Sequence, residues 1–389
     1  MKIRAGANIQ QSTGYKAFIP ELLPPQNPEL QLNLELINLL SQADLRLGKL
    51  VGLSTIIKDP DLFVYLYVRK EALLSSQIEG TQCSLEDLFD SEDLAPGVES
   101  ASLDIKEVSN YVWAMNNGLE KLSTTPISSR LLKELHYLLL TGTRGENKQP
   151  GSFRTSQNWI GRPGANLNTA DFVPPPPNEL DRLMSNLENF IHNHDDFPPL
   201  VKVALVHAQF ETIHPFLDGN GRLGRLLITF LLVSWGVLDK PLLYLSYFFK
   251  ANRTEYYSRL MNIRFKGEWE EWIKFFLNGV IESSEMASTA AIEIFKLHEE
   301  DRQKIQAKNV RNNLILMKIF DVLCKHPTVT VKDLQRLAEI ETYIATSRSI
   351  VQLKELGILK EMSGEKRNKK FTYESYLNIL KRDTVGGMN

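Results

Sequence analysis

Apolar residues recur at spacings of three and four along most of the chain, which is the period of an amphipathic helix. The segments with this pattern are 30–58, 61–79, 104–122, 128–141, 179–193, 200–213, 220–236 and 268–298. The pattern therefore predicts a mainly α-helical protein. Two proline-rich stretches, 20–28 and 174–177, cannot lie inside helices and are expected to be extended connectors.

Residues 151–173 interrupt this pattern. They are rich in Gly, Asn and Thr, with helix breakers throughout, and they predict a β-hairpin or an ordered loop. The C-terminal region has a pattern of its own. After a long polar helix around 283–309, three shorter helices are expected, at 310–326, 330–338 and 342–356.

Two short strands follow these helices, at 358–362 and 371–373, around the basic turn SGEKRNKK at 363–370. Three helices and a β-wing are typical of a winged helix-turn-helix, and 343–356 is the candidate groove-entering helix. The predicted organisation is an N-terminal helical region, a core with the helices that follow it, and the winged helix, with bounds 1–100, 101–300 and 301–389.

The composition is that of a soluble globular protein, with 389 residues, 43% of them hydrophobic and 24% charged. Two cysteines, Cys83 and Cys324, exclude a disulfide framework or a thiolate metal cluster and fit a reducing cytosol. Residues 1–11 resemble neither a secretory signal nor a membrane anchor. The stretch 226–238 is uncharged but shorter than the roughly 18–20 residues that a bilayer needs. We expect a cytoplasmic protein without a membrane segment.

The net charge of −2 hides an uneven distribution. Residues 301–389 contain 17 Lys+Arg and 10 Asp+Glu, a net +7, which leaves −9 for residues 1–300. A basic winged helix favours contact with a DNA backbone, with the basic turn as the contact, although a turn of this composition also occurs as a solvated loop. The two parts are therefore expected to have different partners.

Residues 213–225, IHPFLDGNGRLGR, carry the candidate chemistry. Gly219 and Gly221 bracket Asn220 in a turn that leads into a helix. Such a turn presents free backbone N–H groups and the positive end of the helix dipole to one point, which is an anion site. Arg222 and Arg225, three residues apart, add two guanidinium groups on one helix face that suit phosphate oxygens.

Two further side chains of the motif complete a site for phosphoryl-type transfer. Asp218 would repel a bare phosphate but can hold Mg²⁺ together with substrate phosphates. His214, at the end of the preceding helix, is suited to act as general base for a hydroxyl nucleophile. Base, metal ligand, anion cradle and cationic clamp thus occur within twelve residues.

The segment HPFLDGNGRLGR matches the signature of the Fic family, HxFx(D/E)GNGRxxR, at every specified position. The chain also resembles this family in SSQIEGTQCSLEDL, in RTSQNWIGRPG before the proline run, and in the C-terminal winged helix. The resemblance implies the class with an inhibitory helix N-terminal to a helical core, whose β-hairpin forms a flap. It further implies transfer of AMP from ATP to a Ser, Thr or Tyr hydroxyl of a target protein or of the chain itself, with release of pyrophosphate.

The resemblance assigns a role to each residue of the motif. His214 would deprotonate the target hydroxyl, and Asp218 would hold Mg²⁺ against the α- and β-phosphates of ATP. The backbone amides of Gly219, Asn220 and Gly221, with the Asn220 side chain, would cradle the phosphates.

Two arginines and the flap complete the assignment. Arg222 would stabilise the leaving pyrophosphate, and Arg225 would hold the γ-phosphate. The flap strand near Trp159 and Ile160 would align a target segment by strand addition.

The helix 61–79 ends on an unfavourable charge. Glu79 lies in the last turn, with Gly80 as its C′ residue, and faces the negative end of the dipole at a cost of roughly 0.3–1 kcal/mol. The family's inhibitory pattern (S/T)xxxE(G/N) is met by Ser75, Glu79 and Gly80. The resemblance implies that Glu79 pairs with Arg225 and takes it from the γ-phosphate; an ordinary solvated glutamate is the alternative.

Other functions stay open. His207, Glu211 and His214 share a helix face and could form a metal site. In a second class of function, the winged helix regulates transcription and the Fic core serves as a nucleotide-responsive sensor. Some Fic proteins favour removal of AMP, and homodimers are common in the family.

The remaining aromatic and histidine residues give no further site. The histidines at 136, 192, 194, 298 and 326 form no constellation in the sequence. Tyr111, Trp113 and Trp159 are most simply explained as core or hairpin packing.

Overall fold

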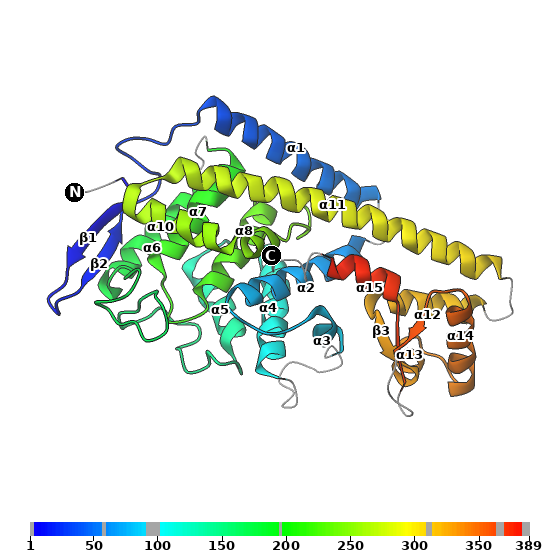
Figure 1. The fold of residues 1–389 in the computed structure, drawn as a ribbon. Coiled ribbons are helices and arrows are strands. Elements are labelled where there is room, and N and C mark those ends of the chain that lie inside the picture. Colours follow the sequence, from blue (N-terminus) through cyan, green and yellow to red (C-terminus); the bar gives the residue numbers. More distant parts are fainter. Residues whose placement is uncertain are drawn as a thin grey trace.

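The computed structural model describes residues 4–56, 60–90, 102–193, 197–308, 313–362 and 369–382. It confirms a mainly helical fold with few strands (Figure 1). The helices are α1 (Leu34–Ile56), α2 (Pro60–Ile78), α3 (Leu85–Asp90), α4 (Leu103–Lys121), α5 (Ser129–Leu140), α6 (Leu180–His192), α7 (Pro199–Ile213), α8 (Asn220–Ser234), α9 (Ser246–Ala251), α10 (Arg253–Lys266), α11 (Trp269–Ala307), α12 (Asn313–Lys325), α13 (Val331–Leu337), α14 (Tyr343–Glu355) and α15 (Glu374–Lys381).

The helix α7 lies at the centre of the core. Every residue from Leu200 to Ile213 is buried, and α7 packs against α6, α8, α10 and α11. A helix that is covered on all sides is expected to carry apolar residues around its whole circumference, and 200–213 does so. Its buried polar residues are Lys202, His207, Gln209, Glu211 and Thr212. The helix α8 follows α7 directly and is buried from Asn220 to Leu232, apart from Gly221.

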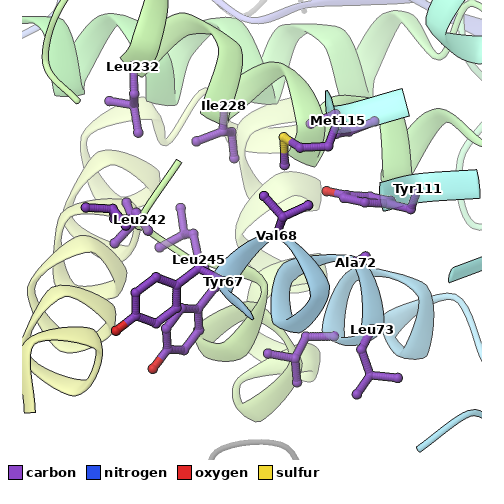
Figure 2. Close-up of a cluster of buried hydrophobic side chains, with 14 of the residues drawn as sticks. Tyr67, Val68, Ala72, Leu73, Tyr111, Met115, Ile228, Leu232, Leu242 and Leu245 are labelled. Carbon is purple, nitrogen blue, oxygen red and sulfur yellow. The ribbon is translucent and has the colours of Figure 1, made fainter. Parts of the chain in front are cut away.

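The helix α2 packs between α4, α8 and α9. In Figure 2, Tyr67, Val68 and Ala72 of α2 lie near Tyr111 and Met115 of α4, with Ile228 and Leu232 of α8 and Leu242 and Leu245 close by. These side chains are buried, and burying one large apolar side chain contributes about 1.5–3 kcal/mol. The end of α2 is thereby brought against the start of α8.

The long helix α11 joins regions that the sequence analysis separated. The N-terminal helix α1 lies along it (Figure 1), and α1 and α11 share the largest interface between elements of the described chain. The expected boundary at residue 300 falls inside α11, which continues to Ala307 before α12 begins. At the N-terminus, β1 (Gly6–Gln10) pairs antiparallel with β2 (Lys16–Pro20), a hairpin that the helical pattern did not predict.

The C-terminal region has the topology of a winged helix. The helices α12, α13 and α14 are joined by a sheet of β3 (Thr328–Thr330), β5 (Lys370–Thr372) and β4 (Lys360–Glu361), in the order β3-β5-β4. Side chains of Thr330 and Thr342 cap α13 and α14. Of the expected basic turn at 363–370, residues 363–368 lie outside the described residues.

The interruption at 151–173 contains a minimal hairpin. Ile160 and Phe172 form an antiparallel bridge in which each N–H donates to the carbonyl of the other, at 2.8 and 3.0 Å. The rest of this segment is irregular. Across the described ranges, no helix has the length and apolarity needed to cross a bilayer.

Candidate active site

The motif 214–225 forms the connection between α7 and α8 and the first turns of α8. We call residues 214–219 the motif loop. It begins and ends in left-handed backbone, at His214 (φ 50°) and at Gly219 (φ 75°). A residue other than glycine rarely adopts a positive φ, and such conformations concentrate at functional sites.

The side chain of Asn220 closes the motif loop. Its Oδ1 accepts the N–H of Phe216, and its Nδ2 donates to the carbonyl of the same residue, both at 2.9 Å. The family resemblance implies that this carboxamide cradles a phosphate. In the structure it is buried and bonded within the loop, so the side chain of Asn220 shapes the loop, and its backbone N–H belongs to the first turn of α8.

The start of α8 presents backbone donors. Leu223 is the first residue whose N–H reaches a helical acceptor, the carbonyl of Gly219 at 3.0 Å, and no side chain caps this end. The amides of Asn220, Gly221 and Arg222 therefore have no partner within the helix. Together with the positive end of the helix dipole, they make an anion-binding end.

Arg222 is buried beside these amides. Its side chain is 6% exposed, and its Nη2 lies 3.8 Å from Oδ1 of Asp218. Within the described ranges, its Nε and Nη1 have no hydrogen-bond partner. A buried guanidinium with open donors is suited to bind an oxyanion, because the alternative is a large desolvation cost.

Asp218 is the metal-ligand candidate. Its carboxylate is 45% exposed, and one oxygen accepts the N–H of Gly219 at 2.6 Å. The described part of the chain contains no group of three His, Cys, Asp or Glu that could hold a metal ion. A lone, accessible carboxylate beside an anion site fits Mg²⁺, which commonly takes one or two carboxylates and the phosphates of its substrate.

His214 is half-buried at the end of α7. Burial of its ring lowers the pKa to about 3, and the nearby charges of Arg264 and Arg154 act in the same direction. Nδ1 of the imidazole has no partner among the described residues. The ring is therefore neutral near pH 7, which is the form that a general base requires.

Ser75 of α2 and Glu79, which directly follows that helix, bind Arg225 of α8. Nη2 of Arg225 donates to Oε1 of Glu79 at 2.7 Å and to the carbonyl of Ser75 at 3.0 Å, and Nε donates to Oγ of Ser75 at 2.8 Å. Burial alone would lower the pKa of Arg225, but Glu79 raises it above its usual value. The charged pair is thus held firmly.

Glu79 also covers the start of α8. A methyl group added to Gly221 would come within 2.2 Å of Oε1 of Glu79, so the carboxylate touches the backbone of that residue. Gly80 follows in left-handed backbone with φ 98° and ends the helix, as expected for a C′ glycine. A carboxylate therefore already occupies part of the anion-binding end.

The flap residues Trp159 and Ile160 directly follow Asn158, which bonds to the motif loop. Trp159 is 43% exposed, so it is not part of the core as one interpretation of the sequence had it. Ile160 makes the bridge to Phe172, and the preceding Asn158 donates from Nδ2 to the carbonyl of Phe216 at 2.9 Å. The flap is thereby tied to the motif loop.

The structure does not favour the metal site on α7. Both ring nitrogens of His207 are engaged, Nδ1 with the carbonyl of Gly224 at 3.0 Å and Nε2 with the hydroxyl of Tyr256 at 2.9 Å. Glu211 is buried behind α8, and burial raises its pKa to about 7. Both side chains contact α8 at Gly224.

Three other expectations have mixed outcomes. Tyr111 is buried, and its hydroxyl donates to Glu71 at 3.1 Å, as core packing predicts. Trp113 is 41% exposed, so its assignment to the core is wrong. His136 contacts the motif loop directly, although the sequence analysis gave it no role. His194 lies outside the described residues.

Comparisons with known sequences agree with this geometry. Residues 37–120 match the Fic/DOC family N-terminal domain, and residues 126–232 match the Fic/DOC family domain. A probable protein adenylyltransferase of Aquifex aeolicus is 41% identical over 70 residues, 18% of this chain and 22% of that protein. The protein adenylyltransferase Fic of Aedes aegypti is 32% identical over 127 residues, 32% of this chain and 22% of that protein.

A third relative, the protein adenylyltransferase Fic of Culex quinquefasciatus, is 26% identical over 206 residues, 51% of this chain and 37% of that protein. The chain therefore spans well under half the length of these relatives. Among solved structures, a Fic family protein of Desulfovibrio desulfuricans covers 88% of this chain and 97% of its own, with a TM-score of 0.56 and 18% identity.

A Fic domain containing signaling protein of Bacteroides thetaiotaomicron covers 65% of this chain and 96% of its own, with a TM-score of 0.51 and 19% identity. At these identities the two likenesses show a shared fold. The matched domains enclose the motif loop, the start of α8 and the end of α2. The chain belongs to the Fic/DOC family.

Proposed function

We propose that this protein is an autoinhibited protein adenylyltransferase, which transfers AMP from ATP to a Ser, Thr or Tyr hydroxyl of a target protein or of itself. One observation carries the proposal: the start of α8 joins open backbone amides to the buried, partly unpaired guanidinium of Arg222, next to a neutral His214. The adenylyltransferase names of the relatives support the choice of reaction.

The chemistry assigns one task to each group. The neutral imidazole of His214 takes the proton of the target hydroxyl, whose oxygen forms a new bond to the α-phosphorus of ATP. The bond from that phosphorus to the bridging oxygen breaks, and pyrophosphate leaves. Arg222 and the amides of Asn220 and Gly221 stabilise the negative charge of the phosphates and of the leaving group.

Asp218 would hold Mg²⁺ together with the phosphates of ATP. The ion supplies charge neutralisation of the phosphate oxygens when it is bound. The carboxylate of Asp218 is 45% exposed, and the N–H of Gly219 orients it through a hydrogen bond of 2.6 Å. The flap would present a target segment by strand addition along Trp159 and Ile160, with the hydroxyl directed at His214.

The brake follows from the ion pair at α2. While Glu79 holds Arg225, that guanidinium is not available to the γ-phosphate, and the carboxylate at Gly221 repels phosphate from the start of α8. ATP then binds with a displaced α-phosphate or not at all. Transfer is sensitive to such displacement, because the reacting atoms must lie about 3–3.5 Å apart and in line.

The experiment is mass spectrometry of the full-length Glu79→Gly protein after incubation with Mg²⁺ and each NTP in turn. We expect a mass increase of one AMP residue with ATP, on the protein itself or on an added target. His214→Ala in the same background should abolish the increase, because no group replaces the base. Persistent transfer by the His214→Ala protein would contradict the assigned mechanism, and release of AMP from a modified target would indicate the reverse reaction.

A second candidate function rests on the winged-helix topology of 313–382. We propose contact with DNA through α14, where Arg348 is exposed and Tyr343 and Ile344 face solvent near the start of the helix. Fluorescence anisotropy with labelled duplex DNA at several salt concentrations tests it, since phosphate contacts weaken steeply with salt. If the His214→Ala protein binds DNA as tightly as the wild type, then DNA binding does not depend on AMP transfer. We also propose a cytoplasmic location and a homodimer for this protein.

A further inference from the structure

The carbonyl groups of the motif loop are held from outside the loop. Nε of Arg154 donates to the carbonyl of His214 at 2.9 Å, and the N–H of Arg154 donates to the carbonyl of Pro215 at 3.0 Å. Nδ2 of Asn158 donates to the carbonyl of Phe216 at 2.9 Å. We call residues 151–158 the brace segment, because these bonds fix three successive peptide groups of the loop.

His136 extends the brace to the residue that carries the metal-ligand candidate. Its Nε2 lies 2.9 Å from the carbonyl of Asp218, and its Nδ1 lies 2.9 Å from the N of Gly151. A backbone N–H can only donate, so Nδ1 is the acceptor and Nε2 carries the proton that is donated to Asp218. The tautomer of His136 is thus fixed by its two partners.

The ring of His136 also supports the loop by packing. It stacks on the ring of Phe216, with centroids 3.8 Å apart and an interplanar angle of 16°. His136 is fully buried on α5, and a methyl group added to Gly219 would lie 3.5 Å from its ring. One side chain therefore contacts the motif loop at Phe216 and Asp218 and lies beside Gly219.

We propose that His136 is a positioning residue for nucleotide transfer: by holding the carbonyl of Asp218 and the ring of Phe216, it sets the place of the Asp218 carboxylate relative to the start of α8. The inference rests on the proposed function, because it concerns the same site. His136 touches no reacting atom; it acts through Asp218. Hydrogen-bond partners of this kind typically change metal affinity or activity by 10–100-fold when they are removed.

The same bonds link the site to the flap. The brace segment leads without interruption into Trp159 and Ile160, and its first residue, Gly151, is the one that His136 binds. The flap and the carbonyls of the motif loop are therefore joined through Arg154, Asn158 and His136.

The test compares two substitutions at this position in the full-length Glu79→Gly protein. His136→Gln keeps an N–H donor at the end of the side chain that can reach the carbonyl of Asp218. His136→Phe keeps the ring and its stacking on Phe216 but removes both hydrogen bonds. His298→Phe is the control for loss of a buried histidine, since His298 is buried against Tyr373 and Phe320, remote from the motif loop.

We expect the His136→Phe protein to need about 10–100-fold more Mg²⁺ for half-maximal binding of ATP and for half-maximal transfer, while the KM for ATP at saturating Mg²⁺ changes much less. His136→Gln should recover most of the wild-type Mg²⁺ dependence, and His298→Phe should leave it unchanged. The thermal unfolding midpoint is measured for each protein. Equal Mg²⁺ dependence in all the proteins, with a fall in the midpoint of His136→Phe alone, would show a structural role and overturn the inference.

Mg²⁺-dependent ATP binding separates this inference from the proposed function. If the Glu79→Gly parent transfers no AMP but binds ATP with Mg²⁺, the proposed function fails while the comparison of His136→Phe with His136→Gln still decides the inference. If the parent transfers AMP and the two His136 substitutions do not differ in either readout, the inference fails and the function stands.

Discussion

The charge state of His214 is determined by its surroundings rather than by its own ordinary pKa. Burial and the charges of Arg264 and Arg154 lower the pKa of the ring to about 3. Arg154 reaches this position to hold the carbonyl of His214, so one guanidinium both fixes the backbone and keeps the imidazole neutral. The proposed general base is thereby kept in its neutral form across the physiological pH range.

This predicts an unusual pH profile of transfer. We expect kcat/KM of the Glu79→Gly protein to stay level from pH 8 to about pH 5 as far as His214 is concerned, because the neutral ring predominates until the pH approaches 3. The measurement is initial rates across this range at saturating Mg²⁺. An acidic limb with its midpoint near pH 6.5, the ordinary value for histidine, would contradict the prediction.

Unfolding must be checked at each pH of that profile. A histidine whose pKa is lowered on folding binds fewer protons in the folded state than in the unfolded state, so its stabilising contribution is fully present above pH 6.5 and is lost as the pH falls through 6.5 toward about 3. His207, whose pKa burial likewise lowers to about 3, acts in the same direction. Thermal unfolding at each pH distinguishes a loss of folded protein from protonation of the His214 ring.

At the scale of elements, the proposed brake is the contact between the end of α2 and the first two turns of α8. Three donor–acceptor bonds join Arg225 to Ser75 and Glu79, and the packing of α2 against α4 and α8 holds them in place. Since α2 is buried along much of its length, its last turn can change with little effect on the rest of the core.

We predict a graded release of the brake. Glu79→Gly removes the carboxylate and should raise AMP transfer several-fold or more, whereas Ser75→Ala removes one bond to Arg225 and should give a smaller rise, since one hydrogen bond to a charged group contributes about 1.5–3 kcal/mol. Automodification with α-labelled ATP measures both. A matched control is Gln77→Ala, on the same turn but bonded to Cys83 and Lys250. Equal transfer by wild type and Glu79→Gly would refute the brake.

The sequence predicts helices and strands well where the local apolar pattern is strong. It predicts them poorly where contacts with residues distant in the chain determine the structure. The expected helix 61–79 is α2 at Pro60–Ile78, and the expected helix 128–141 is α5 at Ser129–Leu140, because apolar spacing and caps are local. The short helices α3, α9 and α15, the longer α10 and the β1–β2 hairpin were missed. Six- to eight-residue helices and five-residue strands carry little periodicity, and α10 buries only Tyr256, Leu260, Ile263 and Arg264.

The same division applies to the site. The motif 214–225 is contiguous, so His214, Asp218 and Arg222 could be proposed as site residues from one segment. His136 could not, because its partner Asp218 lies 82 positions further along the chain. Asn220 was misjudged for a related reason: the sequence does not show that its carboxamide bonds back to Phe216.

At the scale of the whole molecule, the winged helix contacts the segment that follows the proposed brake residue Glu79. The helix α3, which begins six residues after Glu79, contacts β3, and α12 contacts α2. Phe89 of α3 is buried and lines a small cavity with Val329 of β3. Glu86 of α3 pairs with Lys381 of α15. The C-terminal region therefore packs against the chain that follows Glu79 and stabilises α3.

This arrangement predicts that weakening the α3 contact loosens the brake. Lys381→Glu replaces the ion pair with Glu86 by a repulsion, and a partly exposed pair of this kind contributes about 0.2–1 kcal/mol. We expect faster amide hydrogen exchange in α3 and a modest rise in transfer, and we expect the charge exchange Glu86→Lys with Lys381→Glu to restore both. In the Glu79→Gly background the Lys381→Glu change should leave transfer unaltered, because no brake remains to be loosened. An equal effect of Lys381→Glu with and without Glu79 would show that the winged helix acts on transfer by a route other than the end of α2.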